Sequence, residues 1–273
     1  MTIKAKKIGI IGAGVMGQSL IKGLLQSGKV SKKDIWCSVK SELSQKKLSK
    51  DLDVPVLLDF TDQVSSTDIF IICTKPRYVT GVLDDIANAG KMKSSALLIS
   101  IAAGLPISKM QEHLVQKVGL IRAMPNTPCK INSGITVIAK AQQTTNSQME
   151  MAKTIFESVG LCIQLDESHM DAVTAVSGSG PAYIFLMMEA LADGAVRVGL
   201  PRDVAFQLVS QTMLGSAKML QQSGKHPAAL KDEVTTPAGC TIAGLLIMED
   251  GKIRSTLARA VEEATKVSKG LGN

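Results

Sequence analysis

A short strand pattern followed at once by closely spaced glycines constrains this chain most. Residues 8–11 read IGII, residues 12–17 read GAGVMG, and a helical pattern begins there. In such a sequence the first glycine permits a tight turn, the second lets the backbone approach a pyrophosphate, and the third lets helix and strand pack closely. The unpaired N–H groups at the helix start then face the phosphates. The glycines alone are weak evidence, but their place between a strand and a helix predicts a dinucleotide-binding βαβ unit.

Short β-branched or apolar runs recur through the first 165 residues. They lie at 8–12, 35–39, 54–58, 68–73, 96–100, 118–123, 134–139 and 161–165. Helical patterns separate most of these runs, which is typical of a parallel, doubly wound sheet. Pro76 predicts a helix start after the fourth run, and MPNTP at 124–128 predicts a turn.

The pattern changes after Asp166, where β-branched runs give way to Ala, Leu and Met at helical spacing. Long apolar helical patterns cover 181–198, 201–222 and 253–269. We therefore expect an α/β protein with a Rossmann-like, doubly wound domain over residues 1–166 and an all-helical domain over residues 167–273. The broad apolar helix faces exceed what a monomer usually exposes, so we expect a homo-oligomer built through the helical domain.

Composition excludes several classes of protein. The net charge of +7 is spread over the chain and only 3% of residues are aromatic, so nucleic-acid binding is not expected. The longest apolar run, at 95–107, is broken by Ser100, Gly104 and Pro106, so neither a membrane span nor a membrane partner is expected. A secretory signal pattern is missing, which predicts a cytoplasmic protein. The five cysteines are scattered, without Cys-x-x-Cys spacing, so we expect neither disulfides nor a metal site.

The end of the second predicted strand bears on the choice of nicotinamide coenzyme. NAD sites usually place Asp or Glu about 20 residues beyond the glycines, to bind the ribose 2′-hydroxyl. This chain has Ser38, Val39, Lys40 and Ser41 there. A cation with hydroxyls suits a 2′-phosphate, so NADPH is favoured, while Glu42 keeps NADH possible. Lys40 can instead be a solvated loop lysine.

Other coenzyme contacts should come from the ends of later strands, because ligands of open parallel sheets bind at the carboxyl edge. Each of these strand ends can equally be a simple strand-to-helix turn. The residues expected to contact the coenzyme are Ile11, Gly12, Ala13, Gly14, Val15, Met16, Gly17, Ser38, Val39, Lys40, Cys73, Thr74, Lys75, Pro76, Ala102, Ala103, Gly104, Met124 and Asn126.

The sequence offers no obvious general base for a dehydrogenase that oxidises a hydroxyl group. The histidines are His113, His169 and His226, and none lies in a glycine-rich or apolar sequence. Such a dehydrogenase normally needs a base near the reacting carbon. The sequence therefore favours a substrate site that works without such a base.

Residues 235–241, TTPAGCT, suit a carboxylate next to a nitrogen. Pro237 fixes the backbone, and Ala238 and Gly239 are too small to cover the N–H groups of the apolar helix that follows, which leaves an electropositive helix start. Thr236 and Thr241 add hydroxyl donors beside it. A purely structural alternative is open, because Thr is a good N-cap and small residues allow close helix packing.

The whole chain resembles the pyrroline-5-carboxylate reductase family. The matching motifs are GIIGAGVMG (9–17), TKP (74–76), SIAAG (100–104), RAMPNTP (122–128), DAVTAVSGSGPAYIF (171–185) and LKDEVTTPAGCTIAGL (230–245). The last motif is highly specific. Two positions depart from the family: Ala238 replaces the usual glycine, and Phe60 replaces an asparagine that in many members touches the coenzyme ribose.

The resemblance implies hydride transfer from NAD(P)H to the C=N carbon of 1-pyrroline-5-carboxylate, giving L-proline in the last step of proline biosynthesis. It implies Thr241 as the catalytic residue that hydrogen-bonds the ring nitrogen, and the backbone amides around Ala238, Gly239 and Cys240 as the carboxylate site. It also implies a homodimer through the helical domain, assembling further into a higher oligomer such as a decamer. The implied substrate contacts are Glu167, Glu233, Thr236, Ala238, Gly239, Cys240 and Thr241.

Two other functions remain possible from the sequence. A β-hydroxyacid dehydrogenase shares the two-domain plan, but Ile184 stands where such enzymes carry a lysine. A catalytically silent NADPH-binding regulator would be expected to have a filled or altered helix-start pocket, whereas residues 235–241 match the family's pattern.

Overall fold

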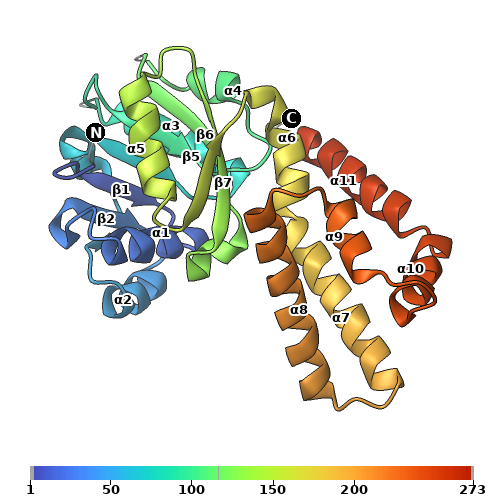
Figure 1. The fold of residues 1–273 in the computed structure, drawn as a ribbon. Helices are drawn as coiled ribbons and strands as arrows, with labels where there is room; N and C mark the ends of the chain where they lie inside the picture. The colour runs from blue at the N-terminus through green and yellow to red at the C-terminus, as the bar shows by residue number, and fades with distance from the viewer. Residues whose placement is uncertain (1–2, 91, 116, 272–273) are drawn as a thin grey trace. The chain divides into compact units, whose positions relative to one another are not determined.

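The computed structural model of this chain describes residues 3–90, 92–115 and 117–271 (Figure 1). It divides into two compact units. The first runs to Ser179 and takes up the chain again from Glu263, while the second, called here the helical unit, is Gly180–Glu262. The domain boundary after residue 166 stays a prediction.

The first unit is built on one eight-stranded sheet with strand order β3-β2-β1-β4-β5-β6-β7-β8. Every predicted run forms one of its strands, so the α/β class and the Rossmann-like arrangement are confirmed. The strands are β1 Ile8–Ile11, β2 Ile35–Ser38, β3 Val56–Leu57, β4 Ile69–Ile72, β5 Leu97–Ser100, β6 Gly119–Met124, β7 Gly134–Lys140 and β8 Gly160–Gln164.

The sheet departs from the predicted all-parallel arrangement at β7, which runs antiparallel to β6, with Met124 opposite Val137. A parallel partner needs a crossover of about a dozen residues or more. Only a short 3-10 segment, Thr127–Ile131, lies in the connection, so the chain has no room to return to the starting edge. β8 then pairs parallel to β7, because the helix α5 provides a crossover between them.

Helices cover both faces of the sheet and form two separate cores (Figure 1). The helices α1 Val15–Gln26, α2 Glu42–Asp51 and α5 Asn146–Phe156 pack on one face, and α3 Val79–Asn88 and α4 Ile107–Gln111 on the other. Pro76 opens a short 3-10 turn, and α3 begins three residues later. After β8, α6 Met170–Val173 and a π-helical turn, Thr174–Gly178, lead out of the first unit.

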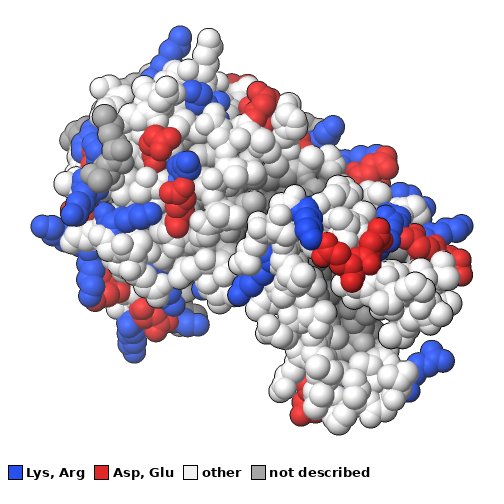
Figure 2. Space-filling model, viewed as in Figure 1, with Lys and Arg blue, Asp and Glu red and all other residues white. Residues whose placement is uncertain are grey.

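The remaining helices are α7 Gly180–Arg197, α8 Arg202–Ser223, α9 Pro227–Val234, α10 Cys240–Asp250 and α11 Ile253–Gly270. The three long helices and the apolar helix after Gly239 agree with the sequence patterns, whereas α9 was not predicted. Neither α9 nor α10 has a buried residue. Figure 2 shows few charged side chains on the visible face of the α7–α8 hairpin. In the described part of the chain, no helix is both long and apolar enough to span a bilayer.

Candidate functional site

The glycine turn after β1 has a geometry that larger residues do not allow. Gly12 has φ +93°, and a Cβ there would lie 3.1 Å from the Cys73 carbonyl oxygen. A Cβ at Gly17 would lie 2.7 Å from the Gly12 carbonyl oxygen, so this glycine lets α1 approach the turn. A Cβ at Gly14 would meet no atom within 4 Å, which leaves the backbone there open to a ligand.

The start of α1 presents free backbone donors to this open space. Gly14 is the N-cap and offers no side-chain cap. The N–H groups of Val15, Met16 and Gly17 have no partner one turn back within the helix, as at any helix start. The turn itself is held by Ser38, whose carbonyl oxygen accepts the N–H groups of Gly12 and Ala13 at 3.0 Å.

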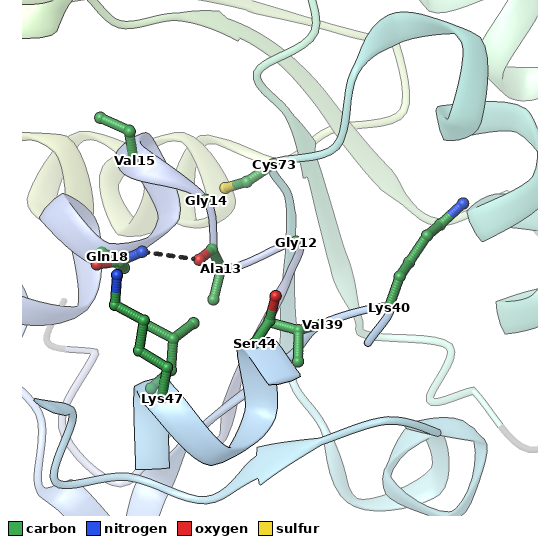
Figure 3. A pocket seen from close by; sticks show the side chains of 11 residues that line it. Gly12, Ala13, Gly14, Val15, Gln18, Val39, Lys40, Ser44, Lys47 and Cys73 are labelled. Carbon is green, nitrogen blue, oxygen red and sulfur yellow. Dashed lines mark hydrogen bonds between the residues drawn. The ribbon is translucent and has the colours of Figure 1, made fainter. Parts of the chain in front are cut away.

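A cavity of about 450 Å³ lies over this turn (Figure 3). It is lined by Gly12, Ala13, Gly14, Val15, Gln18, Val39, Lys40, Ser44, Lys47, Leu48 and Cys73. The bare helix start suits a pyrophosphate, and two lysines with a hydroxyl suit a further phosphate. Thr74, beside the turn, has a buried hydroxyl that finds no hydrogen-bond partner among the residues that the structure describes. These residues fit a nicotinamide dinucleotide.

Sequence reasoning missed four residues of this cavity: Gln18 on α1, and Ser44, Lys47 and Leu48 on α2. The N-cap of α2, Ser41, accepts the Ser44 N–H. Figure 3 shows Lys47 reaching toward Ala13 and Gln18. Residues three apart share a helix face, so a Ser and a Lys at this spacing just after the second strand were the available signal.

Lys40, the predicted phosphate contact, lines the cavity but extends away from the glycine turn (Figure 3). Its Nζ lies 3.6 Å from the centroid of the Tyr78 ring. The Arg77 guanidinium lies 4.7 Å from the same centroid, so the ring contacts two cations.

Other predicted coenzyme residues lie outside this cavity or serve it through backbone. Ile11 and Ser38 are buried in the sheet. Asn126 uses its side-chain oxygen to accept the Ile135 N–H at 2.9 Å. Residues expected from the sequence that do not line the cavity are Ile11, Met16, Gly17, Ser38, Thr74, Lys75, Pro76, Ala102, Ala103, Gly104, Met124 and Asn126. Their coenzyme roles stay predictions.

Phe60, at the position of the family's asparagine, belongs to the core. It is 8% exposed, and its ring stacks on that of Trp36 with centroids 5.9 Å apart. Gly9 makes room for the indole, because a Cβ there would lie 2.1 Å from a Trp36 ring carbon.

In the helical unit, residues 236–239 form a turn before α10. The Gly239 N–H donates to the Thr236 carbonyl oxygen at 3.2 Å. That amide is therefore already used, and the donors without a partner one turn back belong to Cys240, Thr241 and Ile242. Gly239 is the N-cap and provides no side-chain cap, so the start of this eleven-residue helix is open.

Ala238 has φ 56°, in the left-handed region that favours glycine. This explains why a glycine suits the position, and an alanine there costs about 1–2 kcal/mol. A Cβ at Gly239 would lie 2.5 Å from the Thr236 hydroxyl oxygen, so a side chain at 239 requires Thr236 to move.

The predicted substrate residues lie in three places. Five of them surround the start of α10 and are partly or fully exposed, namely Thr236, Ala238, Gly239, Cys240 and Thr241. Glu233, on α9, forms an ion pair with Lys225. Glu167 lies in the first unit, where its Oε1 accepts the Ile107 N–H at 2.7 Å. Their roles in binding substrate stay predictions.

None of the histidines lines the cavity over the glycine turn. His113 lies 2.7 Å from an Asp84 oxygen, His169 is exposed near Ser168, and His226 caps α9 by accepting the Ala228 N–H. Across residues 3–90, 92–115 and 117–271, no three His, Cys, Asp or Glu side chains gather as a metal site would require.

Comparison with known proteins identifies the family. The chain is 42% identical over 267 residues to the pyrroline-5-carboxylate reductase of Methanosarcina acetivorans, covering 98% of both proteins. This chain belongs to the pyrroline-5-carboxylate reductase family. The Arabidopsis thaliana reductase is 40% identical over 97% of this chain and 95% of its own length. Residues 167–271 match the pyrroline-5-carboxylate reductase dimerisation model, and residues 7–104 match "NADP oxidoreductase coenzyme F420-dependent".

Solved reductases share this fold. The Plasmodium falciparum pyrroline carboxylate reductase with NADP bound has a TM-score of 0.88 and 32% identity, covering 98% of this chain and 99% of that one. The Coxiella burnetii reductase has a TM-score of 0.90 and 29% identity, with the same coverage. The pyrroline-5-carboxylate reductase dimerisation match coincides with the apolar helices, as expected for a homo-oligomer.

Proposed function

We propose that this chain reduces 1-pyrroline-5-carboxylate to L-proline with NADPH, the last step of proline biosynthesis. The observation that carries the proposal is the open start of α10, with its free amides at Cys240–Ile242 and the Thr241 hydroxyl beside them. It occurs in a chain that is 42% identical to a curated reductase along nearly its whole length.

The backbone at the start of α10 binds the carboxylate of the substrate. A helix N-terminus favours an anion by about 0.3–1 kcal/mol, and by up to ~2 kcal/mol when partly buried. Hydrogen bonds to a charged group contribute about 1.5–3 kcal/mol each. Together these interactions fix the orientation of the ring, because the carboxylate is attached to the carbon next to the ring nitrogen.

Thr241 donates its hydroxyl hydrogen bond to the ring nitrogen. Its hydroxyl has no hydrogen-bond partner within the described residues, so it is available. As the hydride adds to the carbon, the basic ring nitrogen takes up one proton from solvent, so a strong acid is not needed, and none of the histidines lines the coenzyme cavity. NADPH supplies the hydride. The protein's own contribution is to hold the reacting carbon in a near-attack geometry.

NADPH is favoured by the lysines of the coenzyme cavity, Lys40 and Lys47, and by the hydroxyl of Ser44. A carboxylate is not part of that lining. The exposed apolar side chains of α10 support a homodimer through the helical domain, and we propose that dimers assemble further into a decamer. A cytoplasmic location is also part of the proposal.

The test is the loss of reduced-coenzyme absorbance with the cyclic imine, followed in parallel with NADPH and NADH. We expect rapid oxidation of both, with a lower KM for NADPH. A second assay supplies a 3-hydroxy acid with the oxidised coenzymes, and we expect no reduction. Turnover only in the second assay would favour a β-hydroxyacid dehydrogenase, and no turnover in either would favour a silent coenzyme-binding protein.

A further inference from the structure

Arg122 is the one charged residue that is buried in the part of the chain that the structure describes. It lies in β6 and is 4% exposed. Desolvating a guanidinium costs several kcal/mol unless partners compensate it. Its NH2 lies 3.1 Å from Asp171 Oδ1 and its NH1 lies 3.5 Å from Glu167 Oε1, so two carboxylates compensate one cation. A charge kept at this cost in a sheet interior calls for an explanation.

The partners of Arg122 belong to the segment by which the chain leaves the first unit. Glu167 and Asp171 follow β8 and precede the last residue of this part of the unit, Ser179. The segment that returns at Glu263 reaches the same group, because the Ser268 hydroxyl donates to Asp171 Oδ1 at 2.9 Å. Ser268 is the only residue described as buried in α11. The segment that leads to the helical unit and the segment that returns from it are therefore both linked to the Arg122 guanidinium through Asp171.

Arg122 is also tied to two strand ends on the proposed coenzyme side. Glu167 Oε1 accepts the N–H of Ile107, the first residue of α4, which lies three residues beyond the Ala102–Gly104 loop that follows β5. Met124 lies two residues beyond Arg122 on the same strand. Ser100 and Arg122 are paired across β5 and β6, so these two strand ends share a register.

We propose that Arg122 is a positioning residue for the reduction. It holds the strand ends after β5 and β6 in fixed register with the two segments that lead to and from the helical unit. This inference rests on the proposed function. Arg122 lies outside the coenzyme cavity, and among the predicted substrate residues its ion pair is with Glu167.

The test compares Arg122→Lys, which keeps the charge but loses the forked geometry, with Ser268→Ala, which removes one hydroxyl. We expect kcat to fall about ten- to a hundredfold in Arg122→Lys, because small misplacements of reacting groups have effects of that size. The dissociation constant of NADPH should stay within about twofold, since the glycine turn is unchanged. Ser268→Ala should lower kcat less, in the same direction. The matched control is Lys140→Gln, an exposed lysine nearby, which should keep the wild-type kcat.

Hydrogen exchange gives a readout that does not depend on turnover. In both variants, exchange should rise at the Ile107 amide and over residues 263–271, while strands β1 and β4 stay protected. An unchanged kcat with unchanged exchange at these sites would overturn the proposal. So would a uniform rise over the whole sheet, which would mean that Arg122 only stabilises the fold. If Arg122→Lys does not fold, Ser268→Ala decides by the same criteria. Failure of the wild-type protein to reduce the imine would instead count against the proposed function.

Discussion

The coenzyme cavity contains two lysine side chains from different elements, Lys40 after β2 and Lys47 within α2. Lys40 rests on the Tyr78 ring, whereas Lys47 reaches toward the glycine turn (Figure 3). Lys47 is therefore the better placed of the two to contact a phosphate bound in the cavity, which we take to be the 2′-phosphate that NADPH has and NADH lacks.

We predict that Lys47→Gln weakens NADPH binding about tenfold and leaves NADH binding nearly unchanged. The reason is that a hydrogen bond to a charged group contributes about 1.5 kcal/mol or more. The control is Lys46→Gln, which removes the same charge from an exposed position of α2 outside the cavity. Titration of both coenzymes measures the effect. Equal weakening by the two variants would mean that only overall charge matters.

At the residue scale, the sequence was enough to predict the glycine turn but not the position of each side chain. The glycine turn is local, so Gly12 and Gly14 could be assigned from spacing alone. Lys40 and Phe60 depend on distant partners: the Tyr78 ring holds one, and the Trp36 ring holds the other. Neither contact can be predicted from the residues next to Lys40 or Phe60 in the sequence.

At the scale of elements, Asp68 joins three segments at the amino edge of the sheet. Its carboxylate accepts the Lys7 N–H at 2.9 Å and the Lys93 ammonium at 3.0 Å, with Lys6 at 3.8 Å. Burial alone would raise the pKa of Asp68, but these bonds and charges together hold it below its usual 3.8. Because the folded-state pKa is the lower one, the stabilisation is present above about pH 3.8 and is lost as the pH falls through the folded value.

We predict that Asp68→Asn lowers the free energy of unfolding by about 1–2 kcal/mol at neutral pH. The difference in unfolding free energy between the variant and wild type should shrink as the pH falls below the pKa of a free aspartate carboxyl group. Urea unfolding followed by the fluorescence of the single tryptophan, Trp36, measures it. Asp62→Asn, at an exposed position, is the control. A difference that is constant with pH would show that charge is not involved.

The elements themselves were largely predictable, because buried parallel strands read as continuous apolar runs. The direction of β7 was not, since it depends on the length and shape of the connection after β6. The eight-residue α9 was missed for a similar reason. It has no buried residue, so it lacks the apolar periodicity that identifies a helix.

At the scale of the whole molecule, the helical unit leaves large apolar side chains exposed. On α10, Leu246 is 57% exposed and Ile247 is 72% exposed. Burying such a side chain in a partner contributes about 1.5–3 kcal/mol. In a two-fold symmetric dimer each contact occurs twice, so one substitution removes two contacts and has a large effect on the stability of the dimer.

We predict that Ile247→Asp lowers the mass of the assembly in solution, measured by light scattering at several concentrations. Leu43→Asp, at an 80% exposed position of α2 in the first unit, should leave the mass unchanged. Dissociation by the Leu43 variant and not by the Ile247 variant would place the interface on the first unit.

In the proposed reduction, the open start of α10 holds the substrate and Thr241 donates a hydrogen bond to the ring nitrogen. The most direct measurement compares kcat for the cyclic imine and the NADPH dissociation constant in wild type, Thr241→Ala and Thr241→Ser. Removing one positioned donor typically lowers turnover about 10²- to 10³-fold. We predict a loss of that order in Thr241→Ala, substantial recovery in Thr241→Ser, and coenzyme binding unchanged in both. Full turnover by Thr241→Ala would show that the Thr241 hydroxyl takes no part in the reduction.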